Sequence, residues 1–127
     1  MTFVADRSPD RTEPPAAASG GAICALADIA DGSGRVVTLG HPPEQRCLLL
    51  LRSGDRCYAY DNRCPHFGVP LAERDALLIV DPHRSVKCNV HLARFRWEDG
   101  YCDSGDCVGE SLVSVPLRLE GGLVFLA

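Results

Sequence analysis

Two short segments of this sequence bring cysteine and histidine close together, and both residue types bind soft and borderline metal ions. The first segment runs from Cys64 to His66 and the second from Cys88 to His91. Together they read Cys-x-His, a gap of 21 residues, and Cys-x-x-His. Each segment follows a run of residues typical of a β-strand, so we expect both to be loops held by a sheet. The four residues are the candidate metal ligands.

The spacing of the ligands bears on which metal they would hold. Two thiolates and two imidazoles can form a tetrahedral zinc site. Structural zinc sites usually place at least two residues between ligands of one knuckle, whereas a single residue separates Cys64 from His66. The spacing is easier to satisfy if each segment contributes to two metal atoms. A two-iron cluster permits this, with Cys64 and Cys88 on one iron and His66 and His91 on the other.

The two segments resemble the ligand boxes of the Rieske [2Fe–2S] domain family, and the resemblance covers residues 22–127. Leu71, the run from His91 through Ala93 and Phe95, and the closing segment 116–126 also resemble that family. The resemblance implies one Rieske-type cluster bound by Cys64, His66, Cys88 and His91. A Cys–His nucleophile pair is a weaker interpretation, because nothing identifies an orienting group or an oxyanion site.

The pattern along the chain predicts an all-β domain in which short strands alternate with tight turns. No stretch sustains a helical period over ten residues. The strands are predicted at residues 22–26, 35–39, 46–52, 56–60, 77–80, 85–88, 94–98, 101–102, 112–120 and 123–126. We therefore expect a small antiparallel sandwich or barrel over residues 22–127 with two cluster-binding loops. Residues 1–21, which include Pro9, Pro14 and Pro15, are predicted to form a flexible tail.

Composition narrows the class of protein. A chain of 127 residues is long enough for one domain, and 46% hydrophobic residues can form a core. The 13 basic and 17 acidic residues give a net charge of −4, which argues against a nucleic-acid partner. No apolar run reaches the roughly 18 residues of a membrane helix, and no export signal is recognisable. We therefore predict a soluble, cytoplasmic protein without a membrane partner.

The cysteine count is unusual for so short a chain. Seven cysteines do not fit a closed disulfide framework, and the predicted cytoplasm favours free or metal-bound thiols. We expect Cys102 and Cys107 to be free thiols or part of a locally packed loop, and a disulfide between them or a second metal site stays open. The cysteines within predicted strands should be small buried hydrophobic residues; they are Cys24, Cys47 and Cys57.

Two further positions bear on the reduction potential that the resemblance implies. High-potential Rieske proteins carry a serine and a tyrosine after the second box, and both donate hydrogen bonds towards the cluster sulfurs. Ala93 and Phe95 occupy the matching positions here, and neither side chain can donate. Val69 and Val90 stand where respiratory relatives carry a disulfide. We therefore predict a potential at the low end of the Rieske range of roughly −150 to +300 mV.

The resemblance implies a Rieske-type ferredoxin, which passes single electrons from a reductase to a terminal oxidoreductase such as a ring-hydroxylating oxygenase. Independent catalysis is not expected. A terminal oxygenase would need a second iron held by two histidines and a carboxylate, and only His41 and His83 remain outside the boxes. Two alternatives stay open: a small subunit resembling that of NADH-dependent nitrite reductase, and a zinc-stabilised interaction module. An acidic run follows Trp97 and is either a solvated hairpin or a surface that steers a basic partner. Its residues are Glu98, Asp99, Asp103, Asp106 and Glu110.

Overall fold

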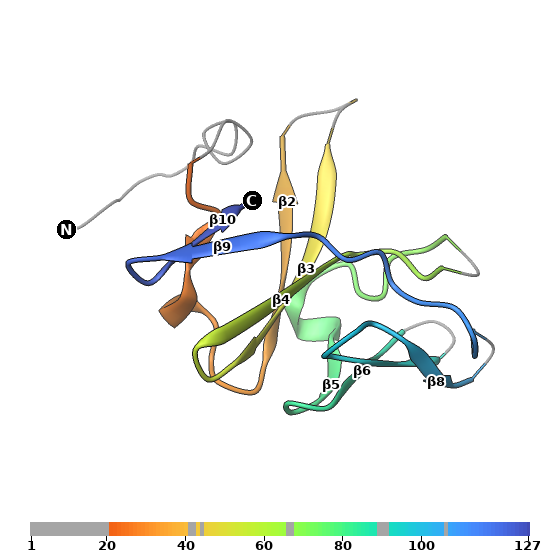
Figure 1. Ribbon diagram of the computed structural model, residues 1–127. Coiled ribbons are helices and arrows are strands. Elements are labelled where there is room, and N and C mark those ends of the chain that lie inside the picture. The colour runs from red at the N-terminus through yellow and green to blue at the C-terminus, as the bar shows by residue number, and fades with distance from the viewer. Residues whose placement is uncertain (1–20, 41–42, 44, 66–67, 89–91, 106) are drawn as a thin grey trace.

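The computed structural model describes residues 21–40, 43, 45–65, 68–88, 92–105 and 107–127. These residues form ten β-strands and two short 3₁₀-helices (Figure 1), which confirms the predicted all-β class. Among the described residues, no helix has the length and apolarity needed to cross a membrane. Of the predicted tail, only Gly21 is among the described residues. The candidate ligands His66 and His91 also lie outside them.

The longest strands form a three-stranded antiparallel sheet. β2 (Gly34–Leu39), β3 (Arg46–Ser53) and β4 (Arg56–Asp61) follow one another, and β3 lies in the centre. Leu48–Leu51 in β3 are fully buried because apolar side chains cover both faces of the strand. Successive side chains of a strand point to opposite faces, so alternate leucines enter two different cores. The predicted hairpin between β3 and β4 is confirmed.

A four-stranded antiparallel sheet carries the second candidate box. It contains β5 (Ile79–Asp81), β6 (Ser85–Lys87), β7 (Arg94–Arg96) and β8 (Cys102–Ser104) in sequence order. The second box lies between β6 and β7. Val86 pairs with Phe95, so the strands on either side of the box are in register.

The third sheet brings the two ends of the described chain together. β10 (Leu123–Leu126) lies between β1 (Cys24–Ala25) and β9 (Leu117–Glu120). The segment before β9 runs back along β4, where the Val115 N–H donates to the Ala59 carbonyl at 2.8 Å. This contact joins the third sheet to the first.

Five predicted strands are shorter than expected, and three of these differences have a local cause. Leu26–Asp28 forms a 3₁₀-helix, in which the Asp28 carboxylate accepts the Ala25 N–H at 3.1 Å. A second 3₁₀-helix, Asp75–Leu77, replaces the start of another strand, and Asp75 accepts the Val36 N–H at 2.7 Å. In both turns an aspartate accepts a backbone N–H, which comes from the same turn for Asp28 and from β2 for Asp75. The predicted strand 112–120 begins only at Leu117 in the structure. It starts directly after Pro116 because proline has no N–H to donate to a neighbouring strand.

Two apolar cores lie on either side of the central sheet. The smaller core contains Ile29, Leu39, Leu48, Leu50, Ala59 and Val115. The larger core contains both candidate cysteine ligands, together with Phe95 and Trp97. Trp97 donates its indole N–H to the Ser85 carbonyl at 2.8 Å, which satisfies its one polar group. Phe95 and Trp97 are therefore core residues.

Candidate metal centre

The two candidate boxes share one backbone design. The Cys64 N–H donates to the Val69 carbonyl at 2.7 Å, and the Cys88 N–H donates to the Ala93 carbonyl at 2.8 Å. The carbonyl of each cysteine accepts the N–H of the residue four positions later, at 2.7 Å in the first box and 2.8 Å in the second. The two boxes are therefore taken from here on as the loops 64–69 and 88–93, each closed by a pair of hydrogen bonds on its cysteine.

The residue four positions after each cysteine has a left-handed backbone. Gly68 has φ +73° and Leu92 has φ +60°. Glycine adopts this conformation without steric cost, whereas a leucine is strained there. The loop geometry therefore requires a left-handed residue at this position, and the second box meets the requirement with a strained side chain. Leu92 is 56% exposed, so the fold gains little burial from it.

Both candidate cysteine ligands are fully buried in the larger core. Cys64 follows β4 by three residues, and Cys88 directly follows β6. Their neighbours in this core include Leu71, Ala93 and Phe95. Two thiols on matched loops in an apolar setting fit the cysteine-bound iron of a two-iron centre, because apolar packing excludes water from the sulfurs.

The histidine half of the candidate centre lies outside the described residues, since His66 and His91 both fall there. Among the residues that the structure does describe, no three His, Cys, Asp or Glu side chains are grouped closely enough to hold a metal. The buried cysteines therefore do not form a cysteine-only site by themselves. A metal held by Cys64 and Cys88 would need ligands other than the described His, Cys, Asp and Glu side chains.

Asn62 organises the first box, although the sequence did not mark it. This buried side chain donates to the Ala72 carbonyl at 2.6 Å and accepts the Leu71 N–H at 2.9 Å. Its backbone N–H donates to the Cys47 carbonyl at 3.0 Å, which ties the box to β3. One amide therefore holds the beginning and the end of the segment that contains Cys64. An asparagine two residues before the box was the only sequence signal.

A third loop, residues 105–110, packs against the second box. A Cβ at Gly105 would lie 2.8 Å from the Cα of Ala93, so only glycine permits this approach. Cys107 lies in the same loop and is fully buried. Its Sγ is 3.4 Å from the Sγ of Cys64. The sequence marked Cys107 as a thiol but did not place it beside a candidate ligand.

The side chains that could donate hydrogen bonds near the cysteines are few among the described residues. Ala93 and Phe95 are fully buried and have no side-chain donor. The hydroxyl of Tyr60 lies in the same core but donates to the Trp97 carbonyl. Burial raises the pKa of Tyr60 to about 12, with a smaller contribution from Asp99. Tyr60 is thus a neutral structural donor.

None of the seven cysteines, all of which are among the described residues, forms a disulfide. Cys24, Cys47 and Cys57 lie in strands as predicted, but they are only partly buried. Burial raises the pKa of Cys24 to about 12 and that of Cys57 to about 11, although Arg35 and the Leu51 backbone oppose the shifts. Both thiols are therefore protonated at neutral pH and poorly nucleophilic.

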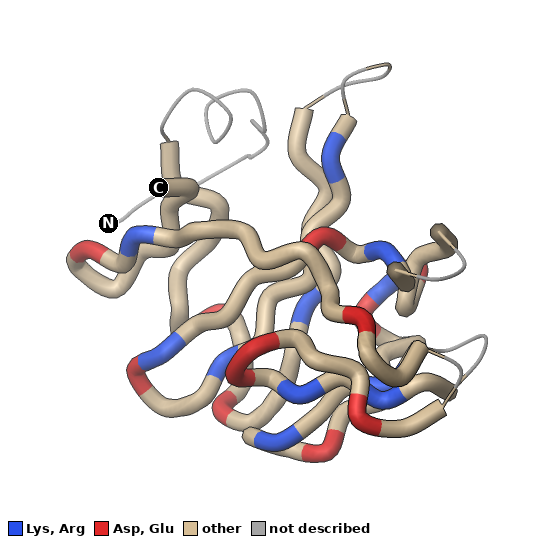
Figure 2. Tube along the Cα trace, turned by 45° about the vertical axis from the view of Figure 1, so that its right-hand side comes forward, with Lys and Arg blue, Asp and Glu red and all other residues tan. Residues whose placement is uncertain are grey.

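Two residues of the acidic run after Trp97, Asp99 and Asp103, are paired with arginines of β7. Arg94 donates to Asp103 at 2.8 Å, and Arg96 forms an ion pair with Asp99. Figure 2 shows acidic and basic residues alternating over this part of the molecule. The hydrogen bond from Arg96 is the main reason that the pKa of Asp99 is lowered. These pairs favour the solvated-hairpin interpretation over a continuous acidic surface.

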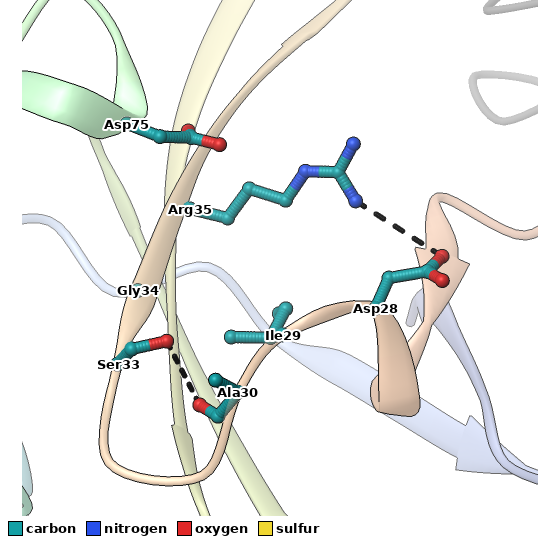
Figure 3. Close-up of a pocket in the computed structure, with 7 residues that line it drawn as sticks. All are labelled: Asp28, Ile29, Ala30, Ser33, Gly34, Arg35 and Asp75. Carbon is teal, nitrogen blue, oxygen red and sulfur yellow. Dashed lines mark hydrogen bonds and ion pairs between the residues drawn. The ribbon is translucent and has the colours of Figure 1, made fainter.

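A surface pocket lies apart from this centre (Figure 3). Its polar groups already interact within the protein. The Ser33 hydroxyl donates to the Ala30 carbonyl at 2.8 Å, and a guanidinium nitrogen of Arg35 lies 4.0 Å from a carboxylate oxygen of Asp28. None of its residues belongs to the core that contains the candidate cysteines. The lining residues are Asp28, Ile29, Ala30, Ser33, Gly34, Arg35 and Asp75.

Comparison with known proteins decides the family. A sequence profile of the Rieske [2Fe-2S] domain matches residues 21–116. The chain belongs to the Rieske [2Fe-2S] domain family. Members carry one Rieske-type [2Fe–2S] cluster, and the two buried cysteines of this Rieske chain fit its cysteine-bound iron. The predicted cofactor is thereby confirmed at the level of the family.

Individual relatives agree with this assignment. The chain is 34% identical over 108 residues to the ferredoxin component of the alkene monooxygenase system of Xanthobacter autotrophicus. The match covers 82% of this Rieske chain and 77% of the relative. The relative is thus similar along most of its length, and not only around the boxes.

Solved structures show the same architecture. A complex of oxygenase and ferredoxin in carbazole 1,9a-dioxygenase contains a chain that is 25% identical, with a TM-score of 0.68. That match covers 85% of this chain and 92% of the other. The terminal oxygenase of carbazole 1,9a-dioxygenase from a Novosphingobium species matches at 27% identity with a TM-score of 0.67. This Rieske chain spans only 29% of that oxygenase chain.

Proposed function

We propose that this Rieske protein is the ferredoxin component of an oxygenase system and carries single electrons to a terminal oxygenase. The supporting observation is the relative in the alkene monooxygenase system, which is similar over 77% of its length and is itself a ferredoxin component. This Rieske protein covers 92% of the matching chain in the carbazole dioxygenase complex. It covers 29% of the matching terminal oxygenase chain. In this proposal the electron donor is a reductase.

The proposed ligands are Cys64 and Cys88 on one iron and His66 and His91 on the other. When bound, the cluster accepts and donates one electron. The protein buries the two cysteine ligands on loops closed by paired hydrogen bonds, so the sulfurs are shielded from water. With the cysteine side buried, we propose that the histidine side faces the redox partner.

Two exposed apolar residues support a docking surface beside these loops. Leu92 belongs to the second box, and Val108 follows Cys107 in the third loop. They are 56% and 58% exposed, respectively. Exposed apolar residues on functional loops are typical of protein-binding surfaces. The proposed surface brings a partner close to the loops that hold the cluster.

We propose a low reduction potential for the centre. Hydrogen bonds to cluster sulfurs stabilise the more negative reduced state, and their absence lowers the potential. Ala93 and Phe95 cannot supply such bonds, and the hydroxyl of Tyr60 is engaged by the Trp97 carbonyl. We expect a midpoint below about +100 mV, within the family range of roughly −150 to +300 mV.

A cytoplasmic location is part of the proposal. Its support is that none of the seven described cysteines forms a disulfide, a pattern typical of a reducing compartment. Cell fractionation followed by detection of the tagged protein tests it. Recovery in a cell envelope or periplasmic fraction would contradict it.

The function is tested on protein purified without air. Iron, sulfide and zinc assays, together with EPR after reduction by dithionite, should show two irons, two sulfides and a rhombic signal. Replacing His66 or His91 with alanine should abolish that signal, whereas His83→Ala should leave it intact. A colourless protein with one zinc would support the structural module instead. Isolation in a stable complex with a large reductase subunit would support the nitrite-reductase-like alternative.

A further inference from the structure

The thiol of Cys107 lies beside one of the proposed iron ligands. Its Sγ is 3.4 Å from the Sγ of Cys64, within hydrogen-bond distance for two sulfur atoms. Both residues are fully buried in the larger core. Water therefore does not compete for this contact, and the two sulfurs lie where they can affect each other.

The backbone of the third loop fixes the position of Cys107. The Glu110 N–H donates to the Cys107 carbonyl at 2.9 Å, and the Cys102 N–H donates to the Glu110 carbonyl at 2.9 Å. Gly105 lies against Ala93 of the second box. The third loop thus packs against the second box and places its thiol, Cys107, beside Cys64 of the first box.

Coordination determines which sulfur donates. Without metal, either thiol can be the donor. A cysteine bound to iron is a thiolate and has no proton, so Cys64 can then only accept a hydrogen bond. The S–H group of Cys107 is the donor in that state, and its interaction with a thiolate is stronger than one between two neutral thiols.

We propose that Cys107 is a positioning residue, which donates a hydrogen bond to the Cys64 ligand and raises the reduction potential of the cluster. The inference rests on the proposed function, because it requires Cys64 to bind iron. Reduction adds negative charge to the cluster and its ligands, so a donor to a ligand sulfur stabilises the reduced state more than the oxidised state. A thiol is a weak donor, and the potential stays at the low end of the family range.

Cys102 provides a matched control. It is also fully buried and belongs to the same core. Its Sγ lies 3.3 Å from the Ser104 carbonyl, so its S–H group is directed to the backbone. Replacing Cys102 with alanine removes a buried thiol of the same size without removing the proposed donor to Cys64.

The experiment compares Cys107→Ala, Cys107→Ser and Cys102→Ala as complete holoproteins. Midpoint potentials are measured by redox titration, with EPR confirming an intact cluster. Loss of the donor should lower the midpoint by the equivalent of a tenfold change in the electron-transfer equilibrium, which is about 59 mV for one electron. Cys107→Ser should recover part of the shift, and Cys102→Ala should remain at the parent value. An unchanged midpoint in Cys107→Ala would overturn the inference.

A second measurement decides the case in which Cys107→Ala does not assemble the cluster. The infrared difference spectrum between the parent holoprotein and Cys107→Ser isolates the S–H stretching band of Cys107. A band shifted to low frequency supports a thiol that donates to a thiolate, and a band at the frequency of an unbonded thiol overturns it. Failure of the proposed function is distinguishable, because the parent protein would then contain no two-iron cluster at all.

Discussion

The side-chain amide of Asn62 donates to the Ala72 carbonyl at 2.6 Å, so one residue spans the loop that contains Cys64. The same side chain accepts the Leu71 N–H, and all these groups are buried. Asn62→Ala would leave two buried backbone groups without partners, each at a cost of about 1–3 kcal/mol. We expect the free energy of unfolding to fall by about 2–6 kcal/mol, measured by anaerobic urea denaturation.

The control for Asn62 is Ser33, whose hydroxyl donates to the Ala30 carbonyl at an exposed turn. Water can replace that bond, so Ser33→Ala should change the unfolding free energy by less than about 0.5 kcal/mol. An Asn62 variant as stable as the Ser33 variant would contradict the role of Asn62 as the clamp of the first box.

The strand pattern and the cysteine spacing were enough to predict the all-β class, the hairpin of β3 and β4, and the family. They could not predict Asn62 or the third loop, because these depend on contacts between residues far apart in the sequence. Cys64 and Cys107 are 43 positions apart, and no local pattern relates them. The two 3₁₀-helices were missed for a similar reason. Asp75, for example, captures an N–H on β2, which strand propensity does not report.

The third loop predicts a difference between two glycines of nearly equal backbone conformation. Gly105 has φ +99° and Gly109 has φ +98°, so at both positions alanine would take a positive φ that L-residues rarely adopt. A Cβ at Gly105 would also collide with the Ala93 backbone, whereas a Cβ at Gly109 meets nothing within 4 Å. Gly105→Ala should therefore be less stable than Gly109→Ala by about 1–3 kcal/mol, as measured by urea denaturation. Equal losses would show that the loop does not press against the second box.

The strained residue of the second box predicts a stabilising substitution. Leu92 has φ +60° and is 56% exposed, while Gly68 occupies the equivalent position of the first box. Leu92→Gly should relieve the strain and raise the free energy of unfolding by about 1 kcal/mol. Leu92→Ala keeps the left-handed strain and should show no such gain. If alanine stabilises the protein as much as glycine does, the gain comes from removing the exposed side chain rather than from the backbone.

Burial of Tyr60 predicts the behaviour of the protein at alkaline pH. Its pKa is raised from 10.0 to about 12, chiefly because burial disfavours the phenolate. The folded protein therefore holds this proton in a pH range where the unfolded chain has lost it. Between pH 10 and pH 12 the folded state binds more protons, so the free energy of unfolding falls as the pH rises. Below pH 10 the tyrosine contributes no pH dependence.

Spectrophotometric titration of tyrosinate in the folded protein checks this shift. The parent should show one titration step near pH 12, and Tyr60→Phe should lack it. Tyr101→Phe, which leaves the buried phenol in place, should retain the step. The Tyr60 variant should also lose about 1 kcal/mol of stability at neutral pH, because the Trp97 carbonyl loses its hydrogen bond. Persistence of the late step in Tyr60→Phe would assign it to another group and remove the basis for the predicted loss of stability.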